Sequence, residues 1–191
     1  EFAMLPMAAM GFQAAWQLAR RAVALGRAHG VRCETWTPAR IRKERMGMLE
    51  EVGKGSSREP RLVKMTWTPP GKSRAPHVVI VGKGIVFDTG GLSLKPVKGM
   101  PAMKSDMAGA AVAAGVAAGA AALGLELRVT CLLPIAENPP SSPSYRPGDV
   151  ITGRLGKSVE IITTDAEGRL ILADALAYGA EMKPDAMIDV A

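Results

Sequence analysis

The sequence predicts an α/β fold with a mixed, mostly parallel sheet and helices on both of its faces. Short apolar runs at 78–81 and 127–135 are typical of buried central strands, and the longer run at 107–123 is typical of a helix. Strand and helix patterns alternate along most of the chain, as they do when helices cover a sheet from both sides. The 191 residues, 48% of them hydrophobic, suffice for such a core.

The chain opens with an expected amphipathic helix over residues 11–29. Apolar side chains recur there at helical spacing, and Gly30 marks the helix end. Residues 31–36 follow as a short strand. We expect residues 1–30 to be an N-terminal linker helix region and residues 31–191 to be one domain, because no clear boundary follows residue 30.

A second helix is expected directly after this strand. Thr37 and Pro38 are typical of an N-cap and a first helical turn. The helix should reach about Arg45, because Gly47 interrupts it. The glycine-rich segment 52–57 is interpreted as a plain turn.

The middle of the chain predicts two strands, a long loop and a buried helix. Residues 61–67 alternate apolar and polar side chains, as a strand with one buried face does. The run 78–81 stops at a glycine, and 82–107 is then rich in Gly, Asp and Lys with little periodicity. Loops of this length in a compact domain are usually functional. The helix over 107–123 is built almost wholly from Ala, Gly and Val, so it can lie very close to the sheet.

The remainder of the chain adds a second polar loop. Residues 163–169 carry two acidic side chains, and this loop, like the one after residue 81, follows a strand. Folds of this class place their sites in loops at strand ends, so we expect side chains of the two loops to meet. The other expected elements are strands over 127–135, 150–152, 158–162 and 186–191 and a helix over 170–180.

The composition excludes several classes of protein. The net charge of +6 is spread out and few aromatic residues alternate with the basic ones, so a nucleic-acid surface is not indicated. Cys33 and Cys131 are far apart and form no disulfide framework or zinc motif, which fits a reducing, cytoplasmic setting. No segment is expected to be long and apolar enough to span a membrane.

Four carboxylates lie in the two polar loops, Asp88 and Asp106 in the first and Asp165 and Glu167 in the second. Bare negative charges held close together repel one another, and divalent cations remove that repulsion. Oxygen-rich sites suit Mg²⁺, Mn²⁺ or Zn²⁺, and shared carboxylates suit two ions about 3.5–4 Å apart. In an extended stretch Asp165 and Glu167 would point the same way. Alternatively, that pair alone could merely favour the start of the following helix.

Two lysines accompany the carboxylates of the first loop. A lysine amine binds a metal only when it is neutral, whereas a charged lysine can polarise a carbonyl or stabilise an oxyanion. Lys83 and Lys95 suit these two roles, and spacing alone leaves open which lysine takes which. Other nucleophilic catalysis is not indicated, because there are only two histidines and no Gly-x-Ser-x-Gly motif.

Three segments together resemble the leucyl (cytosol) aminopeptidase family in residue type, order and spacing. They are 81–96, 103–106 and 164–170, and the resemblance runs from about Arg45 to the end of the chain. It implies a two-metal exopeptidase that removes the N-terminal residue from peptides, with a metal-bridged water as nucleophile. Residues 31–191 would then be part of a metallo-aminopeptidase catalytic domain.

Matching positions imply a ligand set for two divalent cations, Zn²⁺, Mn²⁺ or Mg²⁺. Lys83 would be the neutral lysine ligand, and Lys95 would stay charged and stabilise the tetrahedral intermediate. Asp88 and Glu167 would bridge both ions. The implied ligands are Lys83, Asp88, Asp106, Asp165 and Glu167.

The resemblance also implies roles around the metals. Arg169 would hold a bicarbonate that serves as general base. Met103 would line the pocket for the first side chain of the substrate. Thr163 stands where the family usually has Asn, next to the pocket for the second substrate residue, so it bears on leaving-group preference.

The family continues beyond Ala191 with further strands, and its full-length members form hexamers. This chain, which does not begin with Met, is therefore expected to be truncated at both ends, and its parent protein to be a homo-oligomer. The alternative to the peptidase is an inactive or DNA-binding member of the family that acts as a structural module, although DNA is the less expected partner.

Overall fold

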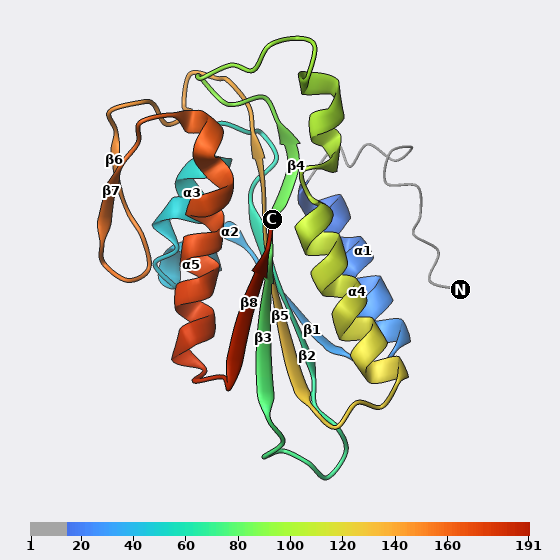
Figure 1. The fold of residues 1–191 in the computed structure, drawn as a ribbon. Helices are drawn as coiled ribbons and strands as arrows, with labels where there is room; N and C mark the ends of the chain where they lie inside the picture. The colour runs from blue at the N-terminus through green and yellow to red at the C-terminus, as the bar shows by residue number, and fades with distance from the viewer. Residues whose placement is uncertain (1–14) are drawn as a thin grey trace.

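The computed structural model of the chain describes residues 15–191 as a central sheet with helices on both faces (Figure 1). The six-stranded sheet has the order β1-β2-β5-β3-β8, and β4 lies beside β5. Its strands are β1 (Arg32–Trp36), β2 (Arg61–Trp67), β3 (His77–Gly82), β4 (Gly84–Asp88), β5 (Arg128–Asn138) and β8 (Ala186–Val190).

The pairing of the strands confirms a mixed, mostly parallel sheet. β3 runs parallel to both β5 and β8, and β4 runs parallel to β5. β1 and β2 form an antiparallel edge, since β2 pairs antiparallel with β1 on one side and with β5 on the other. The central position of β5 agrees with its sequence, because nine of its eleven residues in the burial pattern iBBBBBBBBiB are buried.

Helices cover both faces of the sheet, as expected (Figure 1). α1 and α4 enclose one core cluster that contains Met65 and Cys131, while α2, α3 and α5 enclose a second that contains Trp36 and Leu132. The helices are α1 (Ala15–Ala28), α2 (Pro38–Lys43), α3 (Gly47–Gly53), α4 (Ala108–Ala122) and α5 (Glu167–Glu181). The smaller elements are the 3₁₀ turns η1 (Met100–Ser105) and η2 (Thr164–Ala166) and the antiparallel pair β6 (Val150–Thr152) and β7 (Ser158–Glu160).

Helix α1 packs on the same core as the rest of the described chain, against β2, β1 and α4. The expected start of this helix, 11–14, lies outside the described residues. The division into a linker region, 1–30, and a catalytic part, 31–191, stays a prediction.

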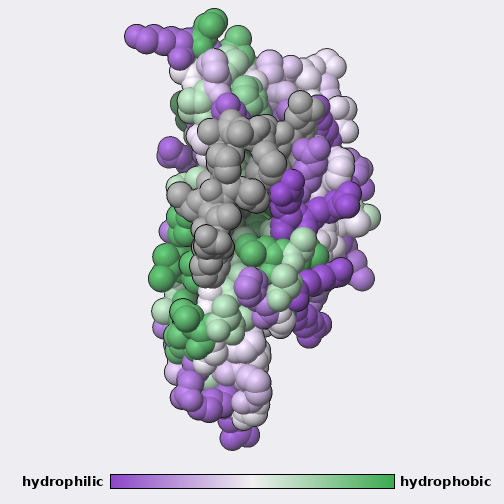
Figure 2. All heavy atoms as spheres, turned by 90° about the vertical axis from the view of Figure 1, so that its right-hand side faces the viewer, coloured by the Kyte–Doolittle hydropathy of each residue, from purple (hydrophilic) through white to green (hydrophobic). Residues whose placement is uncertain are grey.

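Helix α4 packs closely on the sheet because its side chains are small. A Cβ on Gly82 of β3 would lie 2.7 Å from Ala110 Cα, so the backbones of helix and strand are almost in contact there. Contrary to our expectation, Met100–Ala122 has the length and composition of a membrane-crossing helix. Helices that pack on the core of a globular protein share these properties, and α4 buries one face against β5 and β3. Figure 2 looks onto the α1 and α4 side and shows hydrophobic residues gathered there, of which Val112 and Val116 are exposed.

The second predicted helix is present as α2, and an unpredicted helix, α3, follows it. α2 ends at Lys43, and Arg45 adopts a left-handed φ of 57°, which a continuing helix does not permit. Gly47 begins α3 rather than interrupting a helix. The segment 52–57 is therefore only partly a turn, since its first two residues complete α3.

The long loop predicted for 82–107 contains an unexpected strand, β4. This strand continues the course of β3 after a bend at Lys83 and pairs with the far half of β5. β5 is correspondingly longer than predicted and reaches Asn138. The bend was not visible in the sequence, because glycines flank Lys83 on both sides and interrupt the apolar run there.

Candidate metal centre

Three segments bring acidic side chains together at one end of the sheet. Asp88 is the last residue of β4, Asp106 caps η1, and Glu167 begins α5. One carboxylate oxygen from each lies within 4.8 Å of the others. Asp88 is 2% exposed and Glu167 1%, so two charged groups are almost completely withdrawn from water.

Lys83 reaches this cluster because its main chain is held on both sides. Its N–H donates to Val190 O of β8 at 2.8 Å, and its carbonyl accepts from the N–H of Ala110 in α4 at 2.8 Å. The Lys83 Nζ lies 2.7 Å from Asp106 Oδ1 and 3.0 Å from Glu167 Oε1. The lysine at the bend between β3 and β4 is therefore fixed against two of the carboxylates.

Lys95 occupies the other side of the cluster. Its Nζ lies 2.9 Å from Asp88 Oδ2 and also pairs with Asp165. The loop returns to the site through two successive glycines, Gly90 and Gly91, whose φ values of 87° and 62° are strained for other residues. The N–H of Lys95 then donates to the carbonyl of Thr89 at 2.9 Å and closes the loop.

The cluster holds four carboxylates and only two lysines, and several of these groups have shifted pKa values. Burial raises the pKa of Glu167, and the neighbouring Asp88 raises it further. Burial likewise raises the pKa of Asp106. Burial opposes a charge on Lys83, but its ion pairs with Asp106 and Glu167 prevail and raise its pKa. The same balance, with Asp165 and Asp88, raises the pKa of Lys95.

Two buried carboxylate oxygens of the cluster lack a hydrogen-bond partner among the described residues. Among the described residues, neither Asp106 Oδ2 nor Glu167 Oε2 has a hydrogen-bond donor. A buried carboxylate oxygen without a partner is costly, and a divalent cation is the group that satisfies several such oxygens at once. The side chains present therefore fit a divalent metal.

Two neutral residues that the sequence analysis did not single out join the loops around the cluster. Asn138 at the end of β5 is 1% exposed and Thr164 in η2 is fully buried. Asn138 donates to Asp88, and Thr164 bonds to Gly90 and Ser93 in the first loop. The only available sequence signal was the position of Asn138 three residues after the predicted strand 127–135 and directly before two prolines.

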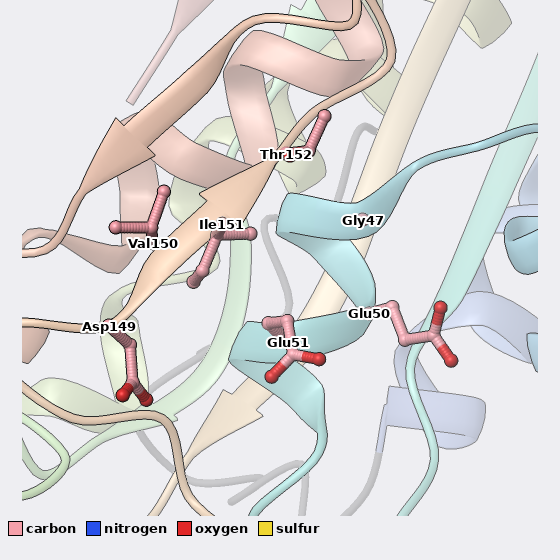
Figure 3. A pocket seen from close by; sticks show the side chains of 7 residues that line it. All are labelled: Gly47, Glu50, Glu51, Asp149, Val150, Ile151 and Thr152. Carbon is pink, nitrogen blue, oxygen red and sulfur yellow. The ribbon is translucent and has the colours of Figure 1, made fainter.

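A pocket of about 290 Å³ lies apart from this cluster, between α3 and β6 (Figure 3). It is also acidic, but each carboxylate at its rim pairs with a neighbouring cation. The pairs are Glu50 with Arg42, Glu51 with Lys54, and Asp149 with Arg146. The partners neutralise this pocket, whereas the oxygens of the cluster remain undersatisfied.

Comparison with known proteins assigns the chain. The model of the cytosol aminopeptidase family, catalytic domain, matches residues 6–191. The chain belongs to the cytosol aminopeptidase family. This confirms the resemblance that the three sequence segments indicated.

Individual members of the cytosol aminopeptidase family agree with this assignment. A probable cytosol aminopeptidase of Rhodococcus jostii is 50% identical over 175 residues, which are 92% of this chain and 34% of that protein. The cytosol aminopeptidase structure from Coxiella burnetii matches with 38% identity and a TM-score of 0.86, over 91% of this chain and 37% of that one. The bottromycin maturation enzyme BotP, in complex with Mn, matches with 40% identity and a TM-score of 0.88, over 95% and 40%. The chain thus spans about a third of the length of the curated relatives it matches.

The structure corrects one expectation about the second loop of this family member. Asp165 and Glu167 are not in an extended stretch and do not point the same way, because η2 and the first turn of α5 turn the backbone between them. Asp165 pairs with Lys95, whereas Glu167 pairs with Lys83. The loop also follows the separate β6–β7 pair and not a strand of the central sheet.

The remaining residues of the predicted site lie on η1, η2 and α5, which also carry acidic side chains or end at them. Arg169 is exposed in the first turn of α5, and Met103 is half-buried in η1. Thr163 is the N-cap of η2, where its hydroxyl accepts from the N–H of Asp165 at 3.2 Å. Thr163 therefore helps to fix the backbone beside the acidic side chains.

Proposed function

We propose that the protein to which this chain belongs is a metal-dependent aminopeptidase that uses two divalent cations to remove the N-terminal residue from peptides. The observation that carries the proposal is the meeting of Asp88, Asp106 and Glu167 with two lysines at one end of the sheet. Membership of the cytosol aminopeptidase family gives this geometry its interpretation.

Five side chains would hold the cations, with Asp88 and Glu167 shared between both ions. Mn²⁺ and Zn²⁺ suit the mixture of carboxylate and amine donors, and the relative BotP was solved with Mn. When bound, the ions supply Lewis acidity at the scissile carbonyl and lower the pKa of a water so that it can attack. The proposed ligands are Lys83, Asp88, Asp106, Asp165 and Glu167.

The residues around the ligands would handle the substrate. Lys95, held charged by two carboxylates, is the donor that would stabilise the oxyanion of the tetrahedral intermediate. Arg169, exposed beside Glu167, would bind a bicarbonate that accepts the proton of the water. Met103 and Thr163 would line the pockets for the first and second residues of the peptide. The free amine of the peptide would bind one of the cations, which makes the enzyme an exopeptidase.

The cellular location and the assembly of the protein are proposed from its relatives. The names of the relatives support a cytosolic enzyme, and the two free cysteines agree with a reducing compartment. We further propose that residues 1–30 form a linker region, that 31–191 form part of the catalytic domain and that the parent protein is a homohexamer. The comparisons do not favour a DNA-binding or purely structural module, because the relatives are named as aminopeptidases.

A peptidase assay on the longest reading frame that contains this chain tests the proposal. With Mn²⁺ or Zn²⁺ present, hydrolysis of leucine p-nitroanilide should fall about 10²–10³-fold in kcat for Lys95→Ala, because one oxyanion donor is lost. The matched control is Lys98→Ala, which removes an exposed lysine from the same loop and should leave the rate unchanged. Full activity of Lys95→Ala would refute the role of this lysine, and absence of activity with every metal would refute the peptidase.

A further inference from the structure

Asn138 contacts two of the three segments that carry the acidic side chains. Its side-chain Nδ2 donates to Asp88 Oδ1 at 2.8 Å and to the carbonyl of Thr164 at 3.0 Å. Both partners are acceptors, so only the amide nitrogen can face them, and the two N–H groups of Asn138 are fully used. Its main-chain carbonyl accepts from Thr89 Oγ1 at 2.7 Å, which ties the residue to the first loop once more.

The amide of Asn138 fixes the orientation of the Asp88 carboxylate. Asp88 Oδ1 accepts from Asn138 and also from the N–H of Gly90 at 2.8 Å, so its acceptor capacity is taken up inside the protein. Asp88 Oδ2 is left to point at Lys95 Nζ, 2.9 Å away. Rotation of the carboxylate would break two buried hydrogen bonds, and the orientation is therefore fixed before any ion binds.

The contact with Thr164 extends this control to the second loop. Thr164 directly precedes Asp165, and its hydroxyl donates to Gly90 O at 2.6 Å and accepts from the N–H of Ser93 at 2.8 Å. Its carbonyl receives Asn138 Nδ2 and also Tyr145 Oη at 2.8 Å. Asn138 is the residue in this network whose side chain bonds directly to a carboxylate of the cluster.

We propose that Asn138 is a positioning residue of the metal centre, which turns Asp88 Oδ2 towards the cations and sets the distance between the strand of Asp88 and the loop of Asp165. The inference rests on the proposed two-metal function. Asn138 binds neither ion nor substrate itself. Residues that orient metal ligands typically change metal affinity about 10–100-fold when they are removed.

The alternative role for Asn138 is purely structural, in which its hydrogen bonds only join two loops. Tyr145 supplies the matched control, because Tyr145→Phe removes a buried donor to the same Thr164 carbonyl but leaves Asp88 untouched. Asn138→Ala and Asn138→Leu both remove the two donors, one with a cavity and one without. An effect shared by both variants comes from the hydrogen bonds, and if one variant fails to fold the other still decides the question.

The test measures Mn²⁺ affinity by isothermal titration and thermal unfolding without metal, for each variant of the longest reading frame that contains this chain. We expect all variants to melt earlier, but only those at Asn138 to lose about 10–100-fold in Mn²⁺ affinity, with Tyr145→Phe within about threefold of wild type. Wild-type affinity in the Asn138 variants, or an equal loss in Tyr145→Phe, would overturn the positioning role. If wild type itself bound no Mn²⁺ or Zn²⁺, the proposed function would fail first.

Discussion

Removing the carboxylate of Asp174 should destabilise the chain more than any surface substitution on the same helix. Asp174 lies in α5 and is 1% exposed. Its Oδ2 accepts from the N–H groups of Met48 and Leu49 at 2.9 and 3.0 Å, and its Oδ1 accepts from the N–H of Arg154 at 2.8 Å. One side chain therefore fastens the start of α3 and the turn after β6 to α5.

The magnitude follows from the donors that Asp174→Ala would leave behind. The two N–H groups at the start of α3 belong to buried residues, and each unsatisfied donor costs about 1–3 kcal/mol. The N–H of Arg154 is partly buried and can form a hydrogen bond to water instead, so the loss of its bond to Asp174 should add little to the destabilisation. Burial raises the pKa of Asp174, which shows that the carboxylate carries a desolvation cost that the substitution removes. The net loss should be about 2–4 kcal/mol, or about 5–15 °C in Tm for a chain of this size.

Urea unfolding followed by circular dichroism measures this loss. Glu181→Ala is the matched control, because Glu181 is also in α5 and pairs with Arg154 but is exposed, so its removal should cost less than about 1 kcal/mol. If Asp174→Ala cost no more than Glu181→Ala, the argument from buried donors would be wrong. A changed m-value would indicate instead that the unfolded state had changed.

Three further predictions concern the metal centre and the thiols. Mn²⁺ at about a hundred times its Kd should stabilise the chain by about 2.7 kcal/mol and raise its Tm, reversibly with EDTA, and an unchanged melting curve would contradict the site. Gly168→Ala places a Cβ 2.8 Å from Lys83 Nζ and should weaken Mn²⁺ binding at least about tenfold by titration calorimetry, whereas Gly115→Ala, which meets nothing within 4 Å, should not. Burial raises the pKa of Cys131 to about 12, so this thiol should react with Ellman's reagent only after urea unfolding. Fast reaction of both thiols, Cys131 and Cys33, in the native protein would refute this.

The sequence predicted which polar segments meet, but not how each is shaped. Asp88 and Asp106 stood out because acidic residues rarely gather after a buried strand without a function. The conformation around Glu167 was missed, because an acidic residue before Gly168 fits a loop as well as a first helical turn. Strand β4 was missed because the bend at Lys83, held by β8 and α4, depends on contacts with residues far along the chain.

The residues that orient the site were harder to predict than the acidic ones. A single Asn or Thr has no spacing that distinguishes it from the many that end strands or cap turns. The importance of Asn138 becomes visible only when its amide is seen between Asp88 and Thr164. Local pattern identifies groups that are chemically unusual, whereas three-dimensional contacts are needed to identify the groups that hold them.

The net charge of the site bears on the protonation of its two lysines. Four carboxylates and two ammonium groups share the site, which leaves two net negative charges. With two divalent cations and both lysines charged, the site would carry two net positive charges, which would favour loss of a proton from one lysine, and the proposed function gives that role to Lys83. In the proposed function, the single positive charge that remains would favour a negatively charged tetrahedral intermediate, and Lys95 would be its donor. Each lysine contacts two carboxylates, so the different roles proposed for the lysine at the strand bend and the lysine in the loop rest on the family resemblance, and spacing in the sequence left them open.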